Sequence, residues 1–112
     1  MSKRADNLLA QDMIDAAEKI YTYTEGFSFE QFCEDSKTSD AVIRNFEIID
    51  EAANRVSEPL KEKYPDIEWH KIRGFRNRIV HDYIDIDYEI VWQIKETYLN
   101  TLLNQLRKIV IE

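Results

Sequence analysis

Residues 40–56, DAVIRNFEIIDEAANRV, carry the clearest structural signal in the sequence. The apolar residues in this stretch recur every three or four positions: Val42, Phe46, Ile49, Ala53 and Val56. This spacing is typical of one buried face of an α-helix. Thr38, Ser39 and Asp40 stand just before it, and each is a good candidate for the N-cap. The stretch therefore predicts a helix that buries one face.

The same spacing predicts three further long helices: Asp6 to about Thr24, about Ile67 to the neighbourhood of His81, and one that follows the N-cap candidates Asp85 and Asp87 and continues to the C-terminus. The last should be the longest. Shorter helices are predicted after Ser28, where Gln31 completes a capping-box pattern, and between Pro59 and Pro65. We therefore expect an all-α fold, an antiparallel up-and-down four-helix bundle with short extra helices, in a single domain spanning residues 1–112.

The composition agrees with this fold class and excludes several others. Only 2 Gly and 2 Pro occur in 112 residues, which favours long helices over short strands and tight turns. The single Cys33 can form neither an internal disulfide nor a Cys-based metal site. No charged and apolar leader opens the chain and no apolar run reaches membrane-spanning length. We expect a cytoplasmic protein without membrane association.

The charge of the chain is negative overall but basic in one place. The net charge is −7, which argues against non-specific binding of nucleic acid by the whole surface. Residues 71–81, in contrast, contain four basic residues and no acidic one: Lys71, Arg73, Arg76 and Arg78. A local basic site on an acidic body is the expectation.

Arg76 breaks the apolar pattern of the predicted helix that contains it. On a straight helix with about 100° per residue, Arg76 falls inside the arc of Trp69, Ile72, Phe75 and Ile79. A buried guanidinium is costly unless it meets an acceptor, so Arg76 needs an anion or a carboxylate. The structural alternative is an internal ion pair, or a side chain that reaches solvent past Trp69.

Asn77 and His81 are four residues apart, and Arg73 lies one turn before Asn77, so the three would line one polar stripe. Arg76 and His81 diverge by about 140° on an unbroken helix. They converge only if the helix ends or bends near His81, or if a second copy brings its own residues to the site. Gly74 either permits close approach of another helix or ligand, or is a tolerated surface glycine.

A His and Arg pair suits cleavage of RNA, because imidazole moves protons near neutral pH and guanidinium holds a phosphate. Tyr83 adds a hydroxyl group nearby. The alternative for His81 is a favourable interaction with the helix dipole at a C-terminus.

Residues 73–83, RGFRNRIVHDY, resemble the signature of HepT-like toxins in the HEPN superfamily. That motif is an Arg, a polar residue, a short spacer, a His, one residue and a Tyr. Arg76, Asn77, His81 and Tyr83 fill its positions. The resemblance covers most of the chain and is densest from Asp66 to Ile94.

The resemblance implies a metal-independent endoribonuclease that is the toxin of a toxin-antitoxin pair, type II-like or type VII-like. It also implies a homodimer, and a nucleotidyltransferase-fold (MNT-type) antitoxin that modifies Tyr83 with nucleotide. In this interpretation His81 is the general base or acid, Arg76 binds the scissile phosphate, Asn77 orients one of them, and Arg73 and Arg78 bind RNA. No metal or cofactor is needed.

Two alternatives stay open at this point. The chain could be a non-catalytic nucleotide- or substrate-binding helical subunit of a nucleotidyltransferase complex. It could also be a purely structural dimerisation bundle, in which Arg76 is an ion-pair residue.

Overall fold

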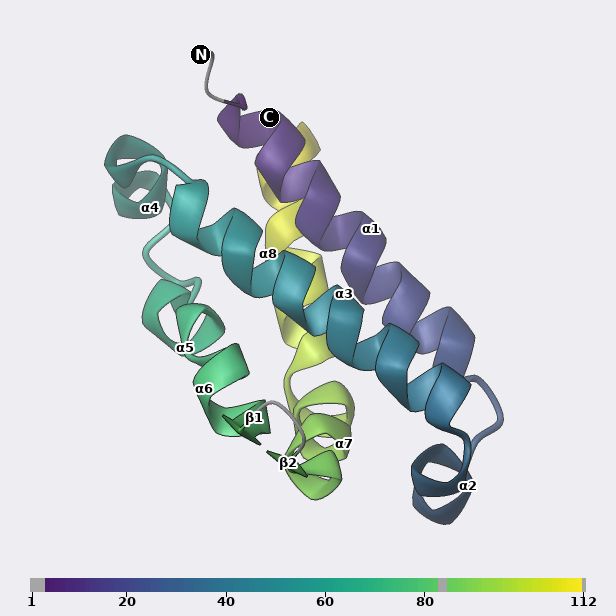
Figure 1. Ribbon diagram of the computed structural model, residues 1–112. Helices are drawn as coiled ribbons and strands as arrows, with labels where there is room; N and C mark the ends of the chain where they lie inside the picture. Colours follow the sequence, from purple (N-terminus) through teal and green to yellow (C-terminus); the bar gives the residue numbers. More distant parts are fainter. Residues whose placement is uncertain (1–3, 83–84, 112) are drawn as a thin grey trace.

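The computed structural model describes the backbone of residues 4–82 and 85–111, and the side chains of these except residues 81, 82 and 111. Within this part of the chain there are eight helices and one two-stranded hairpin, so the predicted all-α class is confirmed. Figure 1 shows the long helices side by side, with the short elements at their ends and along one flank.

Helices α1 (Asp6–Thr24) and α3 (Ser36–Arg55) form an antiparallel pair, against which α8 (Leu99–Ile111) packs (Figure 1). The longest helix is α3, with 20 residues against 13 in α8. The prediction that the C-terminal helix is the longest is therefore wrong. The N-cap of α3 is Asp35, whose carboxylate accepts from the Thr38 N–H at 3.1 Å, and not one of residues 38–40.

Two short helices lie close to where the sequence predicts them. Helix α2 (Phe29–Glu34) begins with a complete capping box between Ser28 and Gln31. Helix α4 (Glu58–Lys63) begins after Ser57, whose hydroxyl accepts from the Leu60 N–H at 3.4 Å. The Asp6 carboxylate accepts from the Ser57 backbone N–H at 3.0 Å, which ties the start of α1 to the start of α4.

The helix predicted from residue 67 to residue 81 is in fact two short helices and a strand. Helix α5 (Trp69–Arg73) ends at Gly74, helix α6 (Phe75–Ile79) follows, and β1 (Val80–Asp82) then pairs antiparallel with β2 (Asp85–Ile86). Gly74 has φ −94° and ψ −2°, well away from helical ψ, so the helix is interrupted there. The Asp87 N–H donates to the Ile79 carbonyl at 2.8 Å and holds the hairpin closed at its base.

The predicted C-terminal helix is also interrupted. Helix α7 (Tyr88–Thr97) begins after Asp87, whose carboxylate accepts from the Ile90 N–H at 3.1 Å, as predicted for this cap. Asp85, the other predicted cap, lies in β2. Helix α7 ends at Tyr98, which has φ −127° and ψ −35°, and α8 begins at the next residue. The Tyr98 ring packs edge-on against Phe75 at 6.1 Å, so the break coincides with a tertiary contact.

One cluster of buried apolar side chains joins the helices. Its largest fully buried members are Phe32, Phe46, Phe75, Met13, Ile20, Ile49, Ile72, Ile79, Leu99, Leu102, Leu106 and Val42. They come from α1, α2, α3, α5, α6 and α8. In the described residues, no helix combines the length and the apolar character needed to cross a bilayer.

Candidate active site

Helices α5 and α6 have one buried face and one exposed basic face. Trp69, Ile72, Phe75 and Ile79 are buried, and the Phe75 ring packs edge-on against Phe46 of α3 at 5.6 Å. The sequence-predicted site residues Arg73, Arg76, Asn77 and Arg78 are all exposed. The buried aromatic anchors therefore fix α5 and α6 on α3 and direct the polar motif residues to solvent.

The prediction that Arg76 lies on the buried stripe is wrong. Its side chain is 61% exposed, and its Nε lies 3.8 Å from the Glu47 carboxylate of α3. Residues 67–81 do not form the single straight helix for which the wheel was drawn, because α5 ends at Gly74 and α6 at Ile79, so that wheel does not place Arg76 correctly. Among the described residues Glu47 is its ion-pair partner, and one pair at this distance contributes little, so the exposed guanidinium can bind an external anion.

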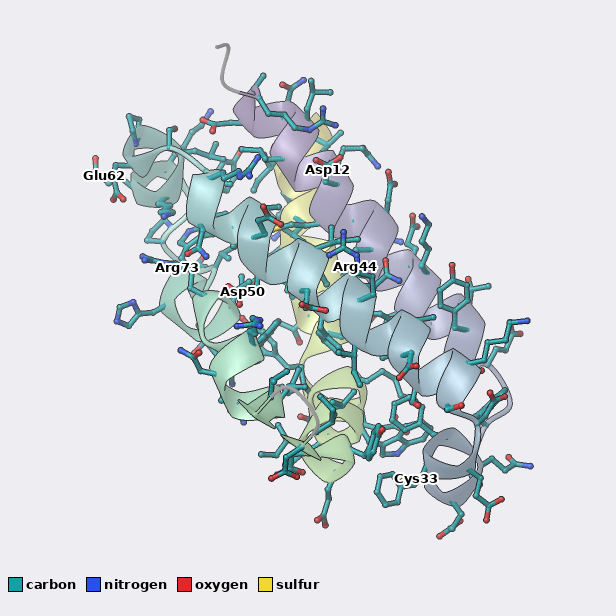
Figure 2. All side chains as sticks on the ribbon, viewed as in Figure 1. Asp12, Cys33, Arg44, Asp50, Glu62 and Arg73 are labelled. Carbon is teal, nitrogen blue, oxygen red and sulfur yellow. The ribbon has the colours of Figure 1, made fainter. Side chains whose placement is uncertain are left out.

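A buried carboxylate lies directly behind Arg76. Asp50 of α3 is only 7% exposed, and its Oδ2 accepts from the Arg76 backbone N–H at 3.4 Å. Burial raises the pKa of Asp50, and Glu47 adds to this effect, whereas the Arg76 N–H and the charges of Arg76 and Arg73 oppose it. Figure 2 shows Asp50 between α3 and α5, on the flank where Arg73 also lies.

Asn54 connects Arg73 to this carboxylate. The Arg73 Nε donates to the Asn54 Oδ1 at 2.5 Å, and the Asn54 Nδ2 donates to the Asp50 Oδ1 at 3.4 Å. Arg73 and Arg76 are therefore both fastened to α3 around Asp50. The predicted polar stripe of Arg73, Asn77 and His81 on one helix is not present, since Arg73 lies on α5, Asn77 on α6 and His81 in β1.

The other half of the motif is only partly described. The backbone of His81 lies in β1, two residues after α6 ends at Ile79. Its side chain, and Tyr83 altogether, lie outside the described residues. The end of α6 at Ile79 means that the angle of about 140° calculated for an unbroken helix does not apply to Arg76 and His81. It meets the first of the two conditions under which His81 and Arg76 could converge, without requiring a second copy.

Sequence reasoning missed the contribution of α3 to this site. Asp50 was not singled out, although it stands four residues after Phe46 and three before Ala53, on the edge of the predicted apolar face. An acid at such a position is a signal for a buried carboxylate. Which partner it would meet could not be predicted, because Arg73 and Arg76 are 23 and 26 residues further along the chain.

The surroundings of Gly74 leave room for a Cβ atom. A Cβ atom at Gly74 would lie 3.5 Å from the Lys71 carbonyl oxygen and 3.6 Å from that of His70, which are ordinary contacts. No close approach within the chain requires this glycine. Among the described residues, no group of three or more His, Cys, Asp or Glu side chains is placed to hold a metal ion.

The sequence of this chain is similar to the sequences of known ribonucleases. The family model described as "Ribonuclease HepT-like" matches residues 13–109. A "Putative RNase" of Methanocaldococcus jannaschii is 32% identical over 109 residues, covering 97% of this chain and 88% of the relative. A "Probable ribonuclease HepT" of Thermococcus cleftensis is 31% identical over 107 residues, covering 96% of this chain and 97% of the relative. No solved structure matched this chain.

Proposed function

Because the chain belongs to the HepT-like ribonuclease family, we propose that it is an endoribonuclease that cleaves RNA with Arg76 and His81 and needs no metal ion. The observation that carries the proposal is the exposed Arg76 guanidinium, which is anchored through its backbone to a buried carboxylate and bound only loosely by Glu47. A scissile phosphate can displace Glu47, because Arg binds phosphate through a planar pair of donors.

The reaction uses the ribose of the substrate as the nucleophile. The His81 imidazole accepts the proton of the 2′-hydroxyl, the 2′-oxygen bonds to phosphorus, and the bond from phosphorus to the 5′-oxygen breaks. The 5′-oxygen takes up a proton, so the products are a 2′,3′-cyclic phosphate end and a 5′-hydroxyl end. Arg76 stabilises the negative charge that develops on the phosphate oxygens, Asn77 orients one of the two groups, and Arg73 and Arg78 bind the RNA backbone.

The chemistry can be tested with the substrate alone. Purified protein in EDTA should cut single-stranded RNA and leave 2′,3′-cyclic phosphate ends, which end-group analysis by mass spectrometry identifies. The same RNA with 2′-O-methyl groups should remain intact, because it lacks the nucleophile. Cleavage of the methylated RNA would refute this mechanism, and binding without any cleavage would favour the alternative of a non-catalytic binding subunit.

We also propose that the protein acts as the toxin of a pair whose antitoxin is a nucleotidyltransferase-fold protein that adds nucleotide to Tyr83. The support is the place of this tyrosine in the motif, two residues after His81. Bulk and negative charge added there would oppose RNA binding. Incubation of the purified pair with ATP should raise the intact mass of the toxin, and Tyr83→Phe should abolish that increase. Equal modification of Tyr83→Phe would show that the assignment is wrong.

A further inference from the structure

A groove of about 730 Å³ opens between α4 and α5, beside the motif. Its apolar wall includes Ile67 and Trp69, both buried, and Arg73 of α5 stands on its border. Only Gly74 separates α5 from α6. A single-stranded RNA bound at Arg76 therefore reaches this groove by passing Arg73. Of the residues that line the groove, only Arg73 has a role in the mechanism proposed above.

The charge of this groove differs from that of the other grooves described. It carries three basic residues, two acidic ones and His70. The groove beside α2 and the start of α3 has three acidic residues against one basic, and that along α7 has three acidic and none basic. The smallest, between α1 and α3, has two of each. On a chain of net charge −7, the groove next to the motif is the one whose charge favours a polyanion.

The side chains of Lys61, Lys71 and Arg73 are held in place by neighbouring groups, and each has N–H donors that can bind a phosphate. The Lys71 ammonium lies over the Tyr98 ring, 4.4 Å from its centroid, and such a contact attracts the charge without occupying all three N–H donors. The Lys61 side chain is 13% exposed and lies 3.7 Å from the Glu58 carboxylate, which is itself 80% exposed. A phosphate can replace so exposed a partner at little cost. Arg73 uses its Nε toward Asn54.

We propose that this groove binds the sugar and phosphate backbone of the single-stranded RNA that flanks the cleaved bond, with Lys61, Lys71 and Arg73 as its phosphate ligands. The inference rests on the proposed ribonuclease function and names a substrate site beyond the motif. Because the ligands are cations that meet phosphates, the groove adds affinity for longer RNA without selecting a base sequence.

The test compares a double variant with a matched control. Lys61→Gln/Lys71→Gln removes two ammonium groups but keeps most of each side chain. Lys19→Gln/Lys37→Gln removes two exposed ammonium groups outside the groove, from α1 and from the start of α3. Binding is measured by fluorescence anisotropy with an uncleavable 2′-O-methyl RNA of about twelve nucleotides at several salt concentrations. Cleavage is measured separately with a dinucleotide, which spans only the scissile phosphate.

We expect the groove variant to bind the longer RNA on the order of tenfold more weakly, with a salt slope reduced by about 1.4 for two lost phosphate contacts. Its rate of dinucleotide cleavage should equal that of the wild type, and the control should match the wild type in both assays. Equal binding by the groove variant and the wild type, or an equal loss in the control, would overturn the groove assignment. Failure of the wild type to cut any RNA would instead refute the proposed function, and the binding assay would still decide the groove.

Discussion

Asp50 is the least expected residue of the site, because its buried carboxylate, between α3 and the segment of α5 and α6, accepts two long hydrogen bonds from the described residues. Its pKa is raised above the ordinary value of 3.8, mainly by burial. The native state therefore binds the Asp50 proton more tightly than the unfolded state does. Stability contributed by this group is highest at acid pH and is lost as the pH rises from about 3.8 through the raised pKa.

Asp50→Asn should remove this pH dependence. The amide imitates the protonated carboxyl, so the variant and the wild type should have equal free energies of unfolding near pH 3. With increasing pH the variant should become the more stable of the two. Urea unfolding of both proteins at several pH values measures the difference, in which the effects of all other carboxylates cancel. A variant less stable than the wild type at pH 7 would mean that Arg73 and Arg76 outweigh burial.

Substitution of Arg76 should affect catalysis but hardly affect stability, because its side chain is 61% exposed. Arg76→Ala should change the free energy of unfolding by no more than about 0.5 kcal/mol, as for most surface substitutions. It should lower RNA cleavage by about 10² to 10³, through loss of phosphate stabilisation. Arg107→Ala is a matched control, since Arg107 forms a similarly exposed ion pair with Glu18 at 3.1 Å. Equal activity in the two variants would remove Arg76 from the mechanism.

The two glycines of the chain, which each follow the end of a helix, differ in their backbone conformation. Gly26 follows α1 with φ +78°, a left-handed conformation that side chains with a Cβ rarely adopt. Gly74 has a negative φ and enough space for a Cβ atom. Within the chain, Gly26 is needed for backbone geometry and Gly74 is not.

The two alanine variants should therefore have opposite effects. Gly26→Ala should destabilise the fold by about 1 to 2 kcal/mol, because the left-handed conformation is strained for alanine. Gly74→Ala should leave stability unchanged or raise it by about 0.4 to 1 kcal/mol, since alanine has less freedom in the unfolded chain. Denaturant midpoints at neutral pH provide the comparison. A loss of RNA cleavage in a stable Gly74→Ala variant would show that the glycine admits a ligand instead.

The elements that sequence predicted correctly have local causes. The capping box at Ser28, Pro59 in the first turn of α4 and the Asp87 cap each lie within a few residues of the start of their helix. The breaks at Gly74 and Tyr98 depend on packing between distant segments, as the contact of Tyr98 with Phe75 illustrates. A three-residue strand such as β1 has too little periodicity to be recognised. Arg76 was misplaced because the prediction assumed one straight helix from residue 67 to residue 81, which is not present.

For the whole molecule, the homodimer remains a prediction from the family resemblance. Because α6 ends at Ile79, between Arg76 and His81, the straight-helix geometry that called for a second copy does not apply to this pair. A dimer should have a mass of twice 13.4 kDa by light scattering at micromolar concentration, and mixed dimers of Arg76→Ala and His81→Ala chains would show whether motifs are shared. A monomeric mass would contradict the prediction and leave a site built by one chain.

The proposed role of His81, proton transfer in RNA cleavage, can be tested by one comparison. Wild type and His81→Ala are compared for cleavage of the same RNA in EDTA, with melting curves recorded for both. We expect His81→Ala to melt like the wild type and to cleave about 10² to 10⁴ times more slowly. A folded His81→Ala protein that cuts RNA as fast as the wild type would contradict it.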